Sequence, residues 1–288
     1  MAAFARRGLG AGTLKMPLKS YLRPRTLDEA LTMRESSSGP AAYIAGGTDL
    51  NAFGDSRLET VVDLSRLGLE GIALAGDVWR LGATTPLADI VRHAGLGAFA
   101  DGLLPRTAAL WRTSLLRERA TLGGVLAGAH ADSDLVAALV ALRAAVLYVG
   151  PGGEKRAAIE TFYRADGSTI LGGGILTALD VPAATSRAAH ERLARARVDA
   201  TIVGAAAVAT GNGWRIALCG VAERVVLVSG ADLNHAGPIG PGVLPRLSDR
   251  ISELISPPDD FRASAAYRRH LADVLARRVL ARVAEAQR

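Results

Sequence analysis

The sequence predicts an α+β fold with two domains. The chain has 288 residues, 49% of them hydrophobic, which is enough for more than one core. In the first two thirds of the chain, short apolar runs alternate with glycine turns and helix-like segments. In the last third, three strand-like runs precede two helical segments, which predicts a small α/β domain built on a three-stranded antiparallel sheet.

The elements of the first domain are predicted from apolar periodicity and turn residues. Thr85 and Pro86 are typical of a helix start, with the threonine as N-cap and the proline in the first turn. Pro151-Gly152-Gly153 predicts a hairpin turn. Strands are expected at 43–45, 60–64, 79–83, 144–149 and 175–182, and further helices at 26–35, 104–111 and 135–142.

The C-terminal part is predicted in the same way. Its strands are expected at 201–209, 214–219 and 225–228, with Asn212-Gly213 as the turn between the first two. Its helices are expected at 243–255 and 263–285. The last helix should bury an apolar stripe of Tyr267, Leu271, Val274 and Leu275.

A change of composition over 182–189 predicts the linker between the domains. We therefore expect a first domain over 16–182, divided near residue 64 into subdomains 16–64 and 65–182, and a C-terminal domain over 190–288. The glycine-rich residues 1–15 are expected to be a disordered extension.

Two glycine turns carry the functional signal. The first is Ala45-Gly46-Gly47-Thr48-Asp49, directly after the apolar step Tyr43-Ile44, and the second is Thr121-Leu122-Gly123-Gly124. Glycine allows positive φ and close approach of the backbone to a ligand, and successive N–H groups in such a turn can bind an anion. Two such turns, each with a threonine hydroxyl, predict the two halves of a clamp on a pyrophosphate.

Composition excludes several other kinds of site. The single cysteine, Cys219, can form neither an internal disulfide nor an iron–sulfur cluster, which needs several thiolates. The five histidines are scattered, which argues against a zinc site. The net charge of +6 comes without aromatic–basic interleaving, so nucleic-acid binding is not expected. The longest apolar run, 135–149, is interrupted by Arg143 and is too short to span a membrane.

The order of the motifs resembles the FAD-binding subunit of the molybdenum hydroxylases, the family of the carbon monoxide dehydrogenase medium subunit and the xanthine dehydrogenase flavin domain. The resemblance covers about Met16 to Arg282. It is carried by Tyr43 to Leu50, Val62-Asp63-Leu64-Ser65, Leu81-Gly82-Ala83-Thr84-Thr85, Ala120 to Gly124, Asp132-Ser133-Asp134-Leu135 and Ala263 to Arg269.

This resemblance implies a two-part FAD-binding domain of the PCMH/VAO-like type, followed by a C-terminal domain of the CO dehydrogenase flavoprotein type. The FAD would be noncovalent. By resemblance, its contacts would be Tyr43, Ile44, Ala45, Gly46, Gly47, Thr48, Asp49, Leu50, Trp111, Thr121, Leu122, Gly123, Gly124, Asp134, Leu176 and Arg192. No catalytic acid or base and no metal ligand is expected in the chain.

The resemblance also implies the partners. A large subunit would hold the molybdenum cofactor and a small subunit two [2Fe–2S] clusters, in a cytoplasmic dimer of heterotrimers. The flavin subunit would take electrons from the clusters and pass them to an external acceptor. The single cysteine agrees with clusters on another chain.

Two positions depart from the family pattern. Val125 stands where the second turn usually continues with asparagine, and Gly172-Gly173-Gly174 precedes a strand that usually begins with an acidic residue. The residues alone also leave simpler interpretations open: Asp134 as a helix N-cap, Trp111 as a core aromatic, and His130 as a loop histidine. The alternative functions are a stand-alone flavin oxidase, an assembly subunit with a degenerate flavin site, and a nucleotide-binding regulator.

Overall fold

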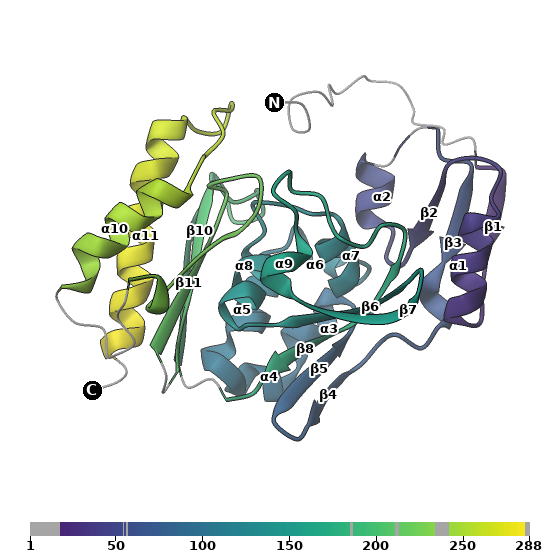
Figure 1. Cartoon of the computed structure of the whole chain (residues 1–288), viewed down its shortest axis with the longest axis horizontal. Helices are drawn as coiled ribbons and strands as arrows, with labels where there is room; N and C mark the ends of the chain where they lie inside the picture. Colours follow the sequence, from purple (N-terminus) through teal and green to yellow (C-terminus); the bar gives the residue numbers. More distant parts are fainter. Residues whose placement is uncertain are drawn as a thin grey trace.

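The computed structural model describes residues 18–53, 55, 57–184, 187–210, 213–233 and 242–285. These residues form three sheets with helices packed between and around them (Figure 1). The predicted α+β class is confirmed. The predicted extension over 1–15 and the turn residue Asn212 lie outside the described residues.

The first sheet is small and parallel, in the order β1-β3-β2. Its strands are β1 (Ser20–Leu22), β2 (Ala41–Ile44) and β3 (Thr60–Asp63), and its helices are α1 (Leu27–Glu35) and α2 (Thr48–Phe53). Thr26 caps α1 by accepting a hydrogen bond from the Glu29 amide at 3.1 Å. β3 is buried along its length because it is the central strand. β2 leads directly into the first glycine turn and α2, on the side facing the rest of the chain (Figure 1).

The second sheet is antiparallel, in the order β4-β5-β8-β6-β7. Its strands are β4 (Ile72–Ala75), β5 (Val78–Gly82), β6 (Ala145–Gly150), β7 (Gly153–Ala158) and β8 (Ile175–Pro182). One face packs against helices through alternating residues such as Trp79 and Leu81 of β5 and Leu179 and Val181 of β8. The helices of this part are α3 (Leu87–Arg92), α4 (Ala94–Ala98), α5 (Leu103–Ala108), α6 (Ser114–Arg117), α7 (Leu122–Ala127), α8 (Asp134–Ala141) and α9 (Ile159–Phe162).

The third sheet has the order β12-β11-β10-β9 and lies between two helical layers (Figure 1). Its elements are β9 (Arg187–Leu193), β10 (Val203–Thr210), β11 (Gly213–Cys219), β12 (Val226–Ser229), α10 (Val243–Leu254) and α11 (Ala265–Glu285). In β10, Ala206 and Val208 face the core that contains α8, whereas Ala205 and Ala207 face the core that contains α11. Small residues on both faces therefore let β10 pack between α8 of the first domain and α11 of its own domain.

The structure corrects several details of the prediction, which also lacked β1 and β4. The C-terminal sheet has four strands instead of three, because β9 occupies part of the predicted linker, and the predicted domain start at residue 190 falls inside this strand. The polar strand β7 follows the confirmed 151–153 hairpin and was not predicted. Pro86, not Thr85, is the N-cap of α3. Tyr267 lies outside the apolar stripe of α11, since it is 47% exposed, whereas Leu271 and Leu275 are buried.

Thr85 makes side-chain hydrogen bonds to a loop. Its Oγ1 accepts a hydrogen bond from the Gly71 amide at 2.9 Å and donates one to the Gly71 carbonyl at 3.1 Å. The threonine therefore fixes the loop before β4 instead of capping α3. β9 and β7 were missed for a different reason. Both are rich in charged residues, which hides the alternating apolar pattern that marks a half-buried strand.

Candidate functional site

The first glycine turn presents unpaired backbone N–H groups. Gly47 has φ +74°, the left-handed conformation that favours glycine. The Asn51 amide donates to the Gly47 carbonyl at 2.9 Å and begins the hydrogen bonding of α2. Within the described part of the chain, the amides from Gly46 to Leu50 donate to no other group. Such consecutive amides can bind an anion.

The second glycine turn has the opposite arrangement. The Leu122 amide donates to the Thr85 carbonyl at 3.0 Å, and the Gly123 amide donates to the Ala83 carbonyl at 2.7 Å. The Gly124 amide donates to Thr121 Oγ1 at 3.2 Å, which caps α7. These amides already have acceptors, so they do not form an open nest like that of the first turn. The predicted FAD contacts of Leu122, Gly123 and Gly124 stay predictions. What this turn can still donate is the hydroxyl proton of Thr121.

The fold brings the two turns together. A Cβ on Gly46 would lie 1.7 Å from the Arg119 carbonyl oxygen and 3.2 Å from the Ala120 Cα, so the first turn packs on the residues that lead into the second. At the other end of α7, His130 Nε2 lies 2.6 Å from Asp49 Oδ2. A Cβ on Gly128 would come within 2.8 Å of both of these atoms, so this contact also needs glycine at 128.

Trp111 lies beside this contact. Its ring meets the His130 ring edge-on with the centroids 5.3 Å apart, and the Arg112 guanidinium lies over it at 5.4 Å. Arg112 and Ala129 both have positive φ, a strained conformation that clusters at functional sites. The buried Trp111 Nε1 has no hydrogen-bond acceptor among the described residues. Trp111 also packs on the main core, so the core interpretation and a ligand contact are compatible.

Tyr43, in the strand before the first turn, links this turn to the segment before β8. Its hydroxyl donates to the Gly173 carbonyl at 3.2 Å, which joins β2 to the triple-glycine segment before β8. Burial raises the pKa of the Tyr43 hydroxyl. Leu176 follows in β8, is 6% exposed and packs in the main core. Its predicted flavin contact stays a prediction.

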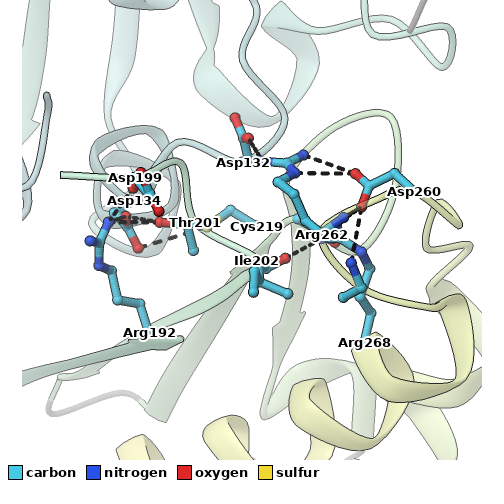
Figure 2. A network of polar contacts seen from close by, with 12 residues as sticks. Asp132, Asp134, Arg192, Asp199, Thr201, Ile202, Cys219, Asp260, Arg262 and Arg268 are labelled. Atoms are coloured by element: carbon cyan, nitrogen blue, oxygen red, sulfur yellow. Dashed lines mark hydrogen bonds and ion pairs between the residues drawn. The ribbon is translucent and has the colours of Figure 1, made fainter. Parts of the chain in front are cut away.

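Asp134 lies where the two domains meet (Figure 2). Its Oδ1 is 2.8 Å from His190 Nε2, and its Oδ2 accepts hydrogen bonds from Thr201 Oγ1 at 2.5 Å and Arg192 at 3.3 Å. The alternative that Asp134 caps α8 is wrong, since Ser133 Oγ accepts from the Val136 amide at 3.3 Å. Asp134 and Arg192, each predicted from the resemblance as a cofactor contact, bind each other in the structure. Their contact with a cofactor stays a prediction.

Sequence reasoning missed His190 of β9 and Thr201, which precedes β10, because both lie more than fifty residues from Asp134 in the sequence. It also gave His130 no role beyond its loop. Val125, the departure in the second turn, is 2% exposed and packs in the main core. The valine therefore fills apolar space, where a side-chain amide would need hydrogen-bond partners.

An open groove of about 660 Å³ lies elsewhere, on the face of the second sheet opposite the helices. It is lined by Arg80 of β5, Arg156 of β7 and the loop 68–71, among others, and by no residue of either glycine turn. Among the described residues, there is no cluster of three or more side chains that could hold a metal ion. No helix formed by those residues is long and apolar enough to cross a membrane.

The groups at the first turn fit FAD. Its diphosphate is an acceptor for the amides from Gly46 to Leu50, and FAD also offers acceptors for a buried indole N–H such as that of Trp111. Glycine at position 47 allows the left-handed backbone conformation that the alignment of these amides requires.

Comparison with known proteins assigns both domains. Residues 15–184 match the family described as the FAD binding domain in molybdopterin dehydrogenase, and residues 188–283 match the CO dehydrogenase flavoprotein C-terminal domain. The carbon monoxide dehydrogenase medium chain of Afipia carboxidovorans is 29% identical over 281 residues, which cover 91% of this chain and 95% of that one.

Solved structures of related enzymes share the fold over nearly the whole chain. Carbon monoxide dehydrogenase from Hydrogenophaga pseudoflava superimposes with a TM-score of 0.85 at 26% identity, covering 94% of this chain and 98% of that chain. Quinoline 2-oxidoreductase from Pseudomonas putida 86 superimposes with a TM-score of 0.83 at 25% identity, covering 94% and 99%. The chain therefore belongs to the molybdopterin dehydrogenase flavoproteins, as a medium, FAD-binding subunit of the carbon monoxide dehydrogenase type.

Proposed function

We propose that this chain binds one FAD noncovalently, between the first glycine turn and the segment from Trp111 to Asp134, and that it transfers electrons within a molybdenum hydroxylase complex. It accepts them from [2Fe–2S] clusters of a small subunit and passes them to an external acceptor. A large subunit holds the molybdenum cofactor, and the assembly is a dimer of heterotrimers.

The observation that carries this proposal is the run of amides from Gly46 to Leu50 that have no acceptor in the described part of the chain. In the proposed complex these amides bind the diphosphate, with Gly47 holding the turn and Thr48 and Thr121 adding hydroxyl donors. Trp111 lies beside them and packs near the adenine. Asp134, Leu176 and Arg192 belong to the far end of the site.

The bound FAD supplies the electron chemistry, and the protein supplies binding, orientation and electrostatics. The chain needs no acid or base for this task. Cys219, the single cysteine, is fully buried, and burial raises the pKa of its thiol well above the ordinary value. It can supply neither a cluster nor a reactive thiolate, which supports the assignment of the clusters to a partner.

The test is the colour of the purified chain. We expect a yellow protein that releases FAD into the supernatant on acid precipitation. A colourless protein that also fails to bind added FAD would exclude the flavoprotein function. Colour that stays with the precipitate would indicate a covalent flavin and favour a stand-alone oxidase.

Isolation of the native complex tests the partners. We expect the chain to copurify with a cysteine-rich small subunit and a much larger subunit that contains molybdenum. Isolation of a fully active oxidase that consists of this chain alone would contradict the proposed electron transfer.

A further inference from the structure

We propose that the C-terminal domain positions the flavin site by holding the segment His130–Asp134, and that Arg262 is the positioning residue for this segment. The inference rests on the proposed function, because it concerns the same site. It adds that residues far from the glycine turns control the affinity for FAD.

The segment 130–134 contacts the first glycine turn, Trp111 and the C-terminal domain. At one end, His130 contacts Asp49 of the first glycine turn, and its ring packs against Trp111. In the middle, the Ala131 carbonyl accepts a hydrogen bond from the Gly220 amide of the C-terminal domain at 2.8 Å. At the other end, Asp134 binds side chains of the third sheet. A displacement of this segment therefore moves groups at the flavin site.

Arg262 anchors the middle of the segment. One guanidinium nitrogen donates to Asp132 Oδ2 at 2.8 Å, and Nε donates to Asp260 Oδ2 at 3.2 Å (Figure 2). The two side chains of the Arg262–Asp132 pair are only 15% and 17% exposed, so solvent screens their attraction less than at the surface. Burial acts to lower the pKa of Arg262, but Asp132 and Asp260 outweigh it, and the pKa is raised.

Asp260 connects this pair to the core of the C-terminal domain. Its Oδ1 accepts a hydrogen bond from Arg268 at 2.8 Å, and the Arg268 side chain is fully buried. Arg268 also donates to the carbonyls of Ile202 and Gly220. The Gly220 amide also donates to the Ala131 carbonyl, so the network reaches the segment at two adjacent residues, Ala131 and Asp132.

The strained backbone beside His130 explains why such an anchor is needed. Ala129 has φ +50°, a strained conformation for a non-glycine residue that persists only when its surroundings impose it. The contacts of Ala131 and Asp132 with the C-terminal domain impose it from one side. Without them the segment can relax and carry His130 away from Asp49.

The experiment compares FAD affinity in four versions of the full-length, flavin-free chain: wild type, Arg262→Gln, Arg262→Lys and Arg277→Gln. Arg277 is the matched control, because it makes ion pairs with Asp273 and a hydrogen bond with Ser248 inside the C-terminal domain without contacting the segment. Affinity is measured by quenching of FAD fluorescence, at a temperature where circular dichroism finds every variant folded.

We expect Arg262→Gln to weaken FAD binding by about 5- to 50-fold, within the usual range of coupling between sites. Arg262→Lys should recover part of the loss, since it keeps a charge that can reach Asp132. Arg277→Gln should bind like wild type. Because coupling is reciprocal, FAD should also raise the melting temperature of Arg262→Gln less than that of wild type at equal FAD concentration.

Three results would overturn the inference. If Arg262→Gln binds FAD like wild type, the anchor does not act on the site, although the proposed function stands. If Arg277→Gln weakens binding equally, the effect is a general loss of stability. If the wild-type chain itself binds no FAD, the proposed function fails, and the inference fails with it.

Discussion

The two glycine turns use their glycines for different physical reasons. In the first turn, Gly47 has a left-handed backbone, and Gly46 lies against the Arg119 carbonyl with no space for a side chain. In the second turn, Gly123 and Gly124 belong to α7 and have no positive φ. The amides of the first turn lack acceptors in the described structure, whereas those of the second turn are used by Ala83 and Thr121.

The difference shows that a Gly-Gly pair next to a threonine does not by itself make an anion site. What decides is whether another segment supplies carbonyls for the amides. The end of β5 does so for the second turn, through Ala83 and Thr85. We therefore expect the second turn mainly to pack α7 against the residues after β5 and to place Thr121, and the first turn to bind the ligand. The following substitutions separate these two tasks.

Substitution of Gly46 should have the largest effect. In Gly46→Ala the new Cβ would overlap the Arg119 carbonyl, which is backbone and cannot rotate away. We expect a loss of stability at or above the upper end of the usual overpacking range of about 1–3 kcal/mol. Thermal unfolding of the purified variant measures it. An unchanged melting temperature would show that the turns do not pack as described.

Substitution of Gly47 should affect binding more selectively. Gly47→Val places a β-branched residue at φ +74°, which costs roughly 1–2 kcal/mol, and its Cβ would come within 2.9 Å of the Ile44 side chain. We expect the affinity for FAD to fall at least about tenfold, equivalent to about 1.4 kcal/mol, because the amides lose their alignment. Fluorescence titration of the folded variant checks this. Wild-type affinity would argue against the first turn as the binding element.

Acid pH should destabilise the strand pair β2–β3, which leads into the first glycine turn, more than it destabilises the contacts of the second turn. Asp63 pairs in register with Ile44, and its carboxylate accepts hydrogen bonds from the Tyr21 hydroxyl at 2.8 Å and the Ser65 amide at 2.9 Å. Burial acts to raise the pKa of Asp63, but these hydrogen bonds outweigh it, so the pKa lies below its ordinary value.

A carboxyl whose pKa is lowered in the folded state stabilises the fold above its unfolded pKa of about 3.9 and loses that contribution as the pH falls through its folded pKa. Asp63→Asn should therefore cost about 1 kcal/mol at pH 7 and less at pH 3. Urea unfolding at both pH values measures the difference. An equal cost at the two pH values would exclude a role for the Asp63 charge.

Substitution of Gly124 should have the smallest effect. In Gly124→Ala the new Cβ meets only Thr121 Oγ1, at 3.0 Å, and alanine favours the helical backbone of α7. We expect a change in stability below about 1 kcal/mol and FAD affinity within about twofold of wild type. A loss of affinity as large as that of Gly47→Val would mean that the two turns bind the cofactor equally, and the contrast between them would be wrong.

The sequence was sufficient to predict the features that depend on residues close together in the chain. It predicted the α+β class, most of the helices and strands and the first glycine turn, because apolar periodicity and glycine placement act over a few residues. The second predicted turn is helical, since Gly123 and Gly124 belong to α7. It did not predict β9, since that strand is charged and the partner of its His190, Asp134, lies more than fifty residues earlier. The hydrogen bonds of the second turn depend on β5, about forty residues earlier, so its sequence resembles that of the first turn while its role differs.

Amide hydrogen exchange, followed residue by residue with NMR, tests the contrast between the turns most directly. Without FAD, the amides from Gly46 to Leu50 should exchange fast and those of Leu122 to Gly124 slowly, because only the latter have acceptors. Addition of FAD should slow exchange in the first turn and leave the second nearly unchanged. Exchange in the first turn that does not respond to FAD, or protection gained mainly in the second turn, would contradict this account.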